Sequence, residues 1–285
     1  MTNILGATTN ILGATTNILG ATTRPFNQLP FAEACLRISR AGYQHVAIFA
    51  NQGVQPIRSD STSAELEDVG RITRDTGLTP SMVLGRTVWD NGLEDAVTQY
   101  RRLIDNSAEV GAGWILDLGT SKEELYEDYV ELMRQVAPSA EAAGVAITMK
   151  PHGGISLTVE HLVQTHRRVD HPAFGICFDP GNIIYYTKGD RRPEPDVEHV
   201  SKLVTSFIVK DCVVVDGEPD VMVTPGDGLV DFPLVLAKLR ASGYSGPSYV
   251  ECVAGGQDAD LVERALTQTF GYIRGIHHAL PLTEV

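Results

Sequence analysis

The stretch A-I-T-M-K-P-H-G-G at residues 146–154 sets the pattern that decides the fold: a short apolar run that ends in polar, catalysis-capable residues. The same pattern recurs in F-G-I-C-F-D-P-G-N (174–182), S-F-I-V-K-D (206–211) and S-Y-V-E-C (248–252). Each apolar run has the length of a buried strand, and a helix-like stretch follows it. Parallel strands of a closed barrel end at one mouth, where barrel enzymes hold their active sites. The four segments therefore indicate an enzyme whose site lies at such a mouth.

The same alternation of strand and helix extends along the rest of the chain. It predicts eight strands, at 17–23, 45–50, 80–85, 114–119, 145–150, 174–179, 206–211 and 248–253. It predicts a helix after each strand, at 31–42, 63–77, 92–110, 122–143, 158–169, near 194–204, at 231–242 and at 259–275. Eight such units favour a single (β/α)8 TIM barrel of the α/β class over an open sheet. No G-x-G-x-x-G follows the first strand, which disfavours a dinucleotide-binding fold.

The amino terminus repeats T-N-I-L-G-A-T three times, at 2–8, 9–15 and 16–22. Each copy has one Ile-Leu pair and no charged flanks, so the repeat does not form the seam of a coiled coil. Only the third copy runs directly into the rest of the domain. We therefore predict a repeated tail at 1–15 and one barrel domain at 16–285.

The composition narrows the classes of function. The chain has 285 residues, a hydrophobic fraction of 43% and a net charge of −13. This length suits one barrel of about 250 residues, and the negative charge argues against nucleic acid and anionic membranes as partners. The sequence has no apolar run of the roughly 20 residues that a membrane span needs and no secretory signal, so we expect a cytoplasmic protein. The four cysteines lack C-x-x-C spacing and are expected to be reduced thiols.

The order of the motifs carries a family resemblance. K-P-H-G-G, D-P-G-N, V-K-D, P-G-D-G-L-V-D-F, G-Y-S-G-P and V-E-C follow one another as in the xylose isomerase-like barrel superfamily, which the chain resembles from about residue 17 to 276. This group contains sugar and sugar-phosphate isomerases and epimerases, inosose dehydratases and endonuclease IV. The resemblance implies a TIM barrel with a small carbohydrate substrate. An endonuclease would need a fuller set of metal ligands and a basic face, and neither is visible in the sequence.

The resemblance also implies a divalent metal, and here the chain departs from the pattern. Sugar-converting members hold one metal with Glu, Asp, His and Glu after strands five to eight. Asp179 and Glu251 match, whereas Lys150 replaces the first Glu and Ile208 replaces the His. A protonated ammonium group cannot ligate a metal. Asp179 and Glu251 together with His152 leave a Mn²⁺ or Mg²⁺ site open.

The departure changes the mechanism that we expect. In the epimerases of the group that the chain resembles, the two metal-bound glutamates act as paired acid and base on the two faces of one carbon. Lys150 in place of one glutamate weakens this scheme, and what remains suits proton abstraction next to a carbonyl. Glu251 is the predicted base, and Lys150 and Lys210, or a metal, are predicted to stabilise the enediolate that forms. A lysine that is desolvated or crowded by another cation is the alternative base. His152 is the fourth catalytic candidate, because it alone of eight histidines lies on this rim motif.

Three further residues are predicted to bind substrate, each with a structural alternative. Asn182 follows D-P-G, where it either contacts substrate or caps the next helix. Trp89, in T-V-W-D-N-G, either stacks on a sugar face or packs within its loop. Asp117 ends the fourth strand near the mouth. Asp211 is expected to brace a loop or cap a helix rather than react.

Together these observations favour an isomerase or epimerase of a small sugar, sugar phosphate or related keto-polyol. A lyase or dehydratase of a keto-sugar or keto-inositol is the alternative within enzymes. Two non-catalytic readings stay open, a sugar-binding barrel and an ion-pair ring that caps the barrel mouth. The sequence also leaves a homo-oligomer open.

Overall fold

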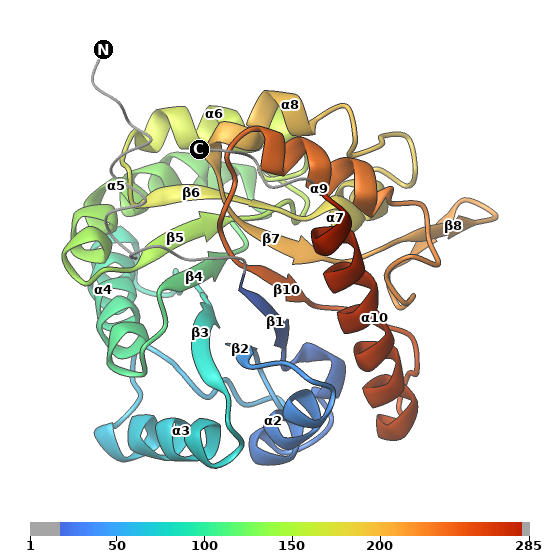
Figure 1. Cartoon of the computed structure of the whole chain (residues 1–285). Coiled ribbons are helices and arrows are strands. Elements are labelled where there is room, and N and C mark those ends of the chain that lie inside the picture. The colour runs from blue at the N-terminus through green and yellow to red at the C-terminus, as the bar shows by residue number, and fades with distance from the viewer. Residues whose placement is uncertain (1–17, 281–285) are drawn as a thin grey trace.

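Eight short parallel strands form the centre of the structure, a computed structural model that describes residues 18–280 (Figure 1). The strands are β1 (Leu19–Thr22), β2 (His45–Ile48), β3 (Thr79–Leu84), β4 (Trp114–Asp117), β5 (Ala146–Met149), β6 (Phe174–Phe178), β7 (Val204–Val209) and β10 (Ser248–Val250). They pair in this order, and β10 returns to β1 to close the barrel. The predicted (β/α)8 TIM barrel is confirmed.

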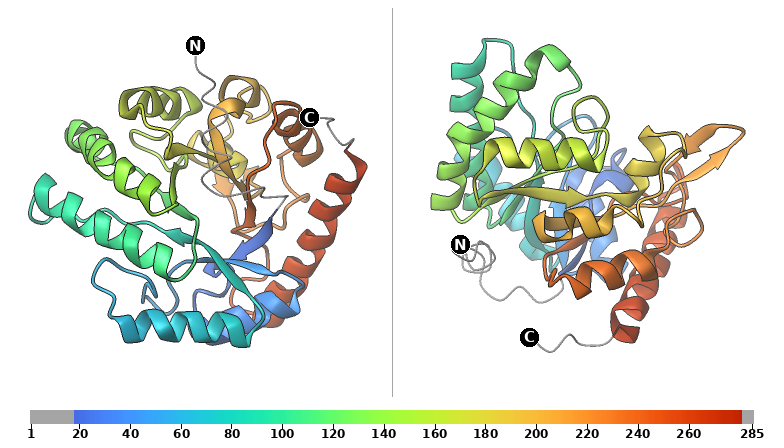
Figure 2. Two further views of the ribbon diagram at one scale, coloured as in Figure 1. Left: turned by 60° about the vertical axis from the view of Figure 1, so that its left-hand side comes forward. Right: turned by 90° about the horizontal axis from the view of Figure 1, so that it is seen from above.

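Helices surround the barrel on its outer side (Figure 2). They are α2 (Phe31–Arg40), α3 (Ser63–Asp75), α4 (Leu93–Glu109), α5 (Tyr126–Ala142), α6 (Val159–Val169), α8 (Val197–Val200), α9 (Phe232–Ala241) and α10 (Ala259–Ala279). Local sequence sets several of their ends; α3, for example, begins at a capping box formed by Thr62 and Glu65. The helix predicted near 194–204 is only the short α8, which is followed by a 3-10 turn, η3 (Ser201–Leu203).

A short helix and a hairpin were not predicted. The first is a short helix, α7 (Pro180–Tyr186), that begins directly after β6. The second is a hairpin of β8 (Val213–Val215) and β9 (Glu218–Asp220), which projects from the body of the barrel (Figure 2). Its turn is Asp216-Gly217, and both residues have positive φ angles. Asp-Gly between two short apolar runs is a recognised hairpin signal, so the sequence did contain the information.

The first strand, β1, comes from L-G-A-T of the third repeat copy. The predicted tail, 1–15, lies outside the described residues. Among the helices that the structure describes, none combines the length and apolar character needed to cross a membrane.

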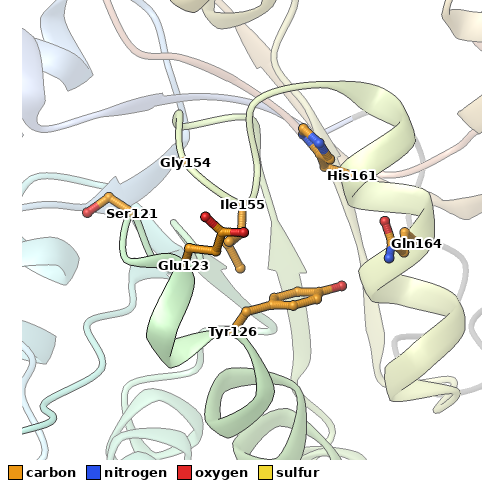
Figure 3. Close-up of a pocket in the computed structure, with 7 residues that line it drawn as sticks. All are labelled: Ser121, Glu123, Tyr126, Gly154, Ile155, His161 and Gln164. Atoms are coloured by element: carbon orange, nitrogen blue, oxygen red, sulfur yellow. The ribbon is translucent and has the colours of Figure 1, made fainter.

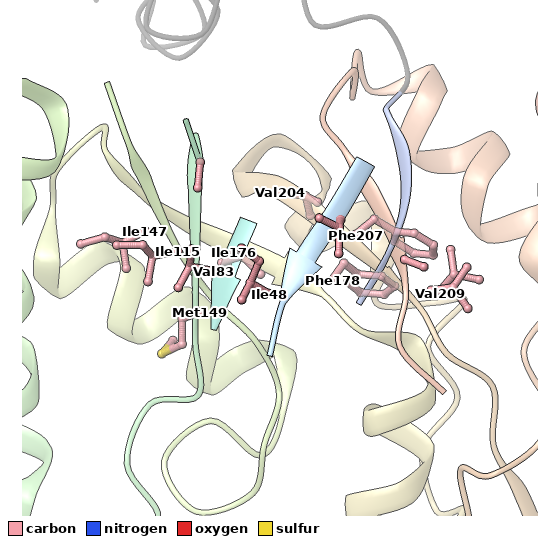
Figure 4. Packing of buried hydrophobic residues seen from close by; sticks show 14 of the residues in the cluster. Ile48, Val83, Ile115, Ile147, Met149, Ile176, Phe178, Val204, Phe207 and Val209 are labelled. Atoms are coloured by element: carbon pink, nitrogen blue, oxygen red, sulfur yellow. The ribbon is translucent and has the colours of Figure 1, made fainter. Parts of the chain in front are cut away.

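The side chains of the strands alternate between two apolar layers. One layer packs between the strands and the helices and includes Ile48, Val83, Ile115, Ile147 and Ile176 (Figure 4). The other is a smaller cluster formed by Ala47, Phe49, Met82, Trp114, Leu116, Ala146, Cys177, Ile208 and Tyr249. These residues come from seven of the eight strands and still touch one another, which only the barrel interior allows.

This alternation positions the site. Because the side-chain period of a strand is two, a residue two places beyond an interior residue also faces the interior. Asp179 follows Cys177, Lys210 follows Ile208 and Glu251 follows Tyr249 in this way. The interior cluster is therefore topped by charged groups at the carboxyl ends of the strands.

Candidate active site

Four charged side chains meet at the carboxyl ends of β5, β6, β7 and β10. They are Lys150, Asp179, Lys210 and Glu251, which we call the charge cluster. Their side chains are between 0 and 4% exposed. Residues that the sequence predicted to converge on the mouth are thus brought into direct contact.

Each carboxylate of the charge cluster is bridged by both ammonium groups. Lys150 Nζ lies 2.6 Å from Glu251 Oε2 and 3.3 Å from Asp179 Oδ2. Lys210 Nζ lies 2.7 Å from Glu251 Oε1 and 3.1 Å from Asp179 Oδ2. Two positive and two negative charges balance, which is the condition for holding charges away from water.

The two lysines differ in how many of their hydrogen-bond donors are used. An ammonium group has three N–H donors. Lys210 directs all three to acceptors, since it also donates to Asn182 Oδ1 at 3.0 Å. Lys150 has two acceptors among residues 18–280 and therefore keeps one donor. All three N–H groups of Lys210 hold neighbouring side chains in place, whereas Lys150 keeps one N–H group for a further hydrogen bond.

Asn182 links three segments of the site. Its backbone N–H donates to Asp179 Oδ1 at 3.0 Å, so Asp179 rather than Asn182 caps α7. Its side chain donates to the carbonyl oxygen of Pro151 at 2.7 Å and accepts from Lys210. A Cβ atom at Gly181 would lie 2.6 Å from the carbonyl oxygen of Lys210, so glycine is required for α7 to approach β7 this closely. The predicted contact of Asn182 with substrate stays a prediction.

The electrostatics of the charge cluster keep Glu251 and Lys210 ionised. Burial alone would raise the pKa of Glu251, but Lys150, Lys210 and Arg24 outweigh it, and the pKa lies well below its ordinary value. Burial alone would lower the pKa of Lys210, but Asp179 and Glu251 outweigh it and raise that pKa. A carboxylate with so low a pKa accepts a proton poorly.

His152 lies at the edge of the charge cluster and differs from it in protonation. Burial, Lys150 and Lys210 together lower the pKa of His152 to about 4, so the imidazole is neutral at pH 7. The ring is partly exposed and packs beside Tyr186, with 5.4 Å between the ring centroids. Neither ring nitrogen has a hydrogen-bond partner within the described part of the chain. His152 is therefore a neutral imidazole with its nitrogens available.

Arg24 belongs to the site and was missed from the sequence. It follows β1, which pairs with β10, and Nη1 lies 3.5 Å from Glu251 Oε1 and in contact with Cys252 Sγ. The sequence did carry a signal, because R-P-F follows the first strand in the same way as the four polar segments follow theirs.

Asp117 neighbours the charge cluster through its backbone, since its carbonyl oxygen accepts a hydrogen bond from the N–H of Lys150 at 3.0 Å. Within residues 18–280, neither its side chain nor that of Trp89 hydrogen-bonds to the cluster. Asp117 and Trp89 both line a hollow of about 250 Å³ between the segments that follow β3 and β4. The carboxylate of Asp117 accepts hydrogen bonds from the hydroxyls of Tyr100 (2.8 Å) and Tyr129 (2.7 Å) and from the N–H of Gly119 (2.8 Å). These contacts give Asp117 a structural role, because they join the end of β4 to α4 and α5. Its substrate role, like that of Trp89, stays a prediction.

A second hollow, of about 410 Å³, opens between η2 (Glu123–Leu125), the start of α5 and α6 (Figure 3). Glu123, Tyr126, His161 and Gln164 line it together with Gly154 and Ile155. No lining residue is a member of the charge cluster. This hollow lies beside the loop that carries His152.

Asp211 braces a loop, as the sequence predicts. Its carboxylate accepts hydrogen bonds from the backbone N–H groups of Cys212, Gly226, Gly228 and Val230 at 2.8 to 3.0 Å. The side chain is completely buried. A single carboxylate thus organises the segment P-G-D-G-L-V.

Replacing Asp211 with alanine should destabilise the fold by about 3 kcal/mol or more, because four backbone donors lose a charged acceptor. The melting temperature should fall by roughly 6 to 12 °C in a thermal scan followed by circular dichroism. Asp227→Ala is the matched control, since Asp227 is an exposed aspartate in the same loop. Equal melting temperatures for the two variants would contradict this role of Asp211.

The residues present do not fit the divalent metal that the resemblance implies. A cation between Asp179 and Glu251 would stand beside two ammonium groups, and like charges at that distance repel. Ile208, at the position of the usual His, is apolar and buried in the interior cluster. Within residues 18–280 no three His, Cys, Asp or Glu side chains gather in a metal-binding group, so His152 does not complete the predicted ligand set.

Comparisons with known proteins agree with the fold. The family model described as xylose isomerase-like TIM barrel matches residues 35–269. Comparison with curated protein sequences gives no significant match. A xylose isomerase-like TIM barrel protein from Mycobacterium smegmatis, in complex with magnesium, is 17% identical with a TM-score of 0.70, covering 90% of this chain and 98% of that one.

Two sugar epimerases are also similar in structure. D-psicose 3-epimerase from Clostridium cellulolyticum H10, with D-tagatose, is 14% identical with a TM-score of 0.70, covering 90% of this chain and 98% of its own. The 3-keto-D-glucoside 4-epimerase from E. coli is 18% identical with a TM-score of 0.67, covering 91% and 99%. At these identities the likeness concerns the fold alone.

Proposed function

Because the chain belongs to the xylose isomerase-like TIM barrel family, we propose that it is an enzyme that removes a proton from the carbon beside a carbonyl group of a small carbohydrate. The charge cluster is the observation that carries this proposal. Removing four charges from water costs several kcal/mol per ion, so a buried ion-pair network is weak support for stability. Clusters of this kind are instead typical of sites that stabilise developing charge.

Lys150 is the group that stabilises the reacting oxygen. Proton removal places negative charge on the carbonyl oxygen, as an enediolate. Lys150 keeps one N–H donor after binding Asp179 and Glu251, and it can donate that hydrogen bond to the oxygen. A donor of this kind at a developing oxyanion typically contributes about 3 kcal/mol. Lys210 has no donor left and acts as a positioning residue.

His152 replaces Glu251 as our candidate for the base. Glu251 was predicted in this role, but its two ammonium partners at 2.6 and 2.7 Å lower its pKa and make it a poor proton acceptor. His152 is also a weak base, because its pKa is lowered to about 4. It is nevertheless the better candidate, since it is uncharged at pH 7 and no ammonium group occupies its ring nitrogens. Its position two residues beyond Lys150 brings a base and an electrophile to the same strand end.

The proton balance is the same for each outcome. A proton moves from the carbon to His152, and the electron pair moves to the carbonyl oxygen. In an isomerisation the proton returns to the former carbonyl carbon. The hydroxyl group on the carbon that lost the proton then gives its own proton to the former carbonyl oxygen and becomes the new carbonyl group. Epimerisation returns a proton to the opposite face of the same carbon and needs a second acid there. One imidazole on one side of the substrate therefore favours isomerisation.

The experiment that tests this proposal detects exchange of carbon-bound hydrogen. The protein is incubated in D₂O with a panel of aldoses, ketoses, their phosphates and a keto-inositol, and proton NMR follows loss of the signal next to the carbonyl. We expect exchange in at least one compound and its loss in His152→Gln. Binding of panel members with exchange in none of them would contradict the proposal and support a sugar-binding barrel.

Dehydration is a second candidate, favoured by Lys150 in place of the family glutamate. The same enediolate can expel a hydroxide from the next carbon, and the ejected hydroxide takes up a proton and leaves as water. Mass spectrometry separates the two reactions, since isomerisation preserves the substrate mass and dehydration lowers it by one water.

A further inference from the structure

Arg24 sits on a firmly built part of the mouth. It begins the 3-10 turn η1 (Arg24–Phe26), whose other two residues, Pro25 and Phe26, are buried. Thr23 fixes the turn to the next strand end, because its hydroxyl donates to the carbonyl oxygen of Phe49 at 3.1 Å and accepts from the N–H of Phe49 at 3.0 Å. The backbone is thus held while the Arg24 side chain is 39% exposed.

Most of the Arg24 guanidinium is not used by the protein. Only Nη1 has contacts, with Glu251 Oε1 at 3.5 Å and with Cys252 Sγ. In the part of the chain that the structure describes, Nε and Nη2 have no hydrogen-bond acceptor. A guanidinium presents five donors in a planar fork that matches carboxylate and phosphate groups. The unused edge is therefore suited to an anion.

The positive charge of Arg24 is not needed to balance the charge cluster. The two lysines and two carboxylates of the charge cluster already neutralise one another. The Glu251 carboxylate already has both lysine ammonium groups at 2.6 and 2.7 Å, so its contact with Arg24 at 3.5 Å adds little to its charge compensation. Arg24 and the charge cluster together therefore carry one net positive charge, in a chain whose net charge is −13. A local positive charge in an acidic protein concentrates anions at that point.

We propose that the substrate carries an anionic group, a carboxylate or a phosphate, and that Arg24 binds it at the edge of the charge cluster. This inference rests on the proposed function, because it takes the bound anion to be part of the reacting molecule. The reacting carbonyl then lies at Lys150 and the anionic group at Arg24. Arg24 is accordingly a specificity-determining residue.

Titration calorimetry with malonate, inorganic phosphate and the neutral polyol erythritol tests this directly. We expect at least one anion to bind the wild type with an affinity that falls as salt is added, and erythritol to bind far more weakly. Malonate and phosphate distinguish a carboxylate from a phosphate substrate. Arg24→Gln should weaken the anion roughly ten- to a hundredfold, the range for a hydrogen bond to a charged group. Arg24→Lys, which keeps the charge and loses the fork, should fall between.

Arg102→Gln is the matched control, because Arg102 is an exposed arginine on α4 and its removal changes the net charge equally. Binding of neither anion to the wild type, or equal affinity in Arg24→Gln and wild type, would overturn the inference. Thermal scans show whether Arg24→Gln is folded, and Arg24→Lys keeps the test informative if it is not. Binding needs no turnover. Anion binding that depends on Arg24, without hydrogen exchange in any carbohydrate, would therefore refute the proposed reaction and leave the anion site standing.

Discussion

Lys150→Met is expected to lower kcat/KM by a factor of about a hundred to a thousand, the typical cost of removing one donor to a developing oxyanion. The loss should fall on kcat more than on KM, because the oxygen carries full negative charge only after the proton has left. Initial rates of deuterium exchange provide the measurement.

The variant should remain folded, since Glu251 keeps Lys210 and Arg24 as partners. Lys202→Met is the control, because Lys202 is exposed and lies before β7, far from the strand ends that form the mouth. Full activity in Lys150→Met would show that the charge cluster is a capping ring and that the reaction, if any, occurs elsewhere.

Lys150→Glu combined with Ile208→His is expected to raise the affinity for Mn²⁺ at least a hundredfold. The double variant removes an ammonium group that repels a cation and supplies a carboxylate and an imidazole, so that four family-type ligands surround one point. Calorimetry at pH 7.5 measures the change. Each single variant is its own control and should gain less, since each supplies only part of the set. A double variant that binds Mn²⁺ no better than the wild type would show that the strand ends do not converge as described.

The sequence was sufficient to predict the barrel and the convergence of its charges. Both follow from local pattern: apolar runs of strand length, a helix after each, and a polar residue at the end of Ala146–Met149 and its equivalents. The period of two then places Lys150, Asp179, Lys210 and Glu251 on the interior side. Closure of the barrel brings these positions together whatever the details of the helices.

The roles within the site could not be predicted in the same way. Lys150 and Glu251 are 101 residues apart, and their 2.6 Å contact depends on how the closed barrel sets the strands relative to one another. Lys210 differs from Lys150 in having a third hydrogen-bond acceptor, the side-chain oxygen of Asn182. This contact depends on the amide orientation of Asn182, which lies in the unpredicted helix α7. The low pKa of His152 likewise comes from groups on other strands as well as its own.

In the proposed mechanism, Lys150 provides the positive charge that the family resemblance assigns to a metal. Deuterium exchange is measured in protein dialysed exhaustively against a chelator, with metal content checked by mass spectrometry. We expect the metal-free protein to keep its rate within about twofold and to gain nothing from added Mn²⁺. Complete loss of exchange on chelation, restored by Mn²⁺, would contradict this mechanism and would mean that Asp179 and Glu251 hold a working metal despite their two lysine partners.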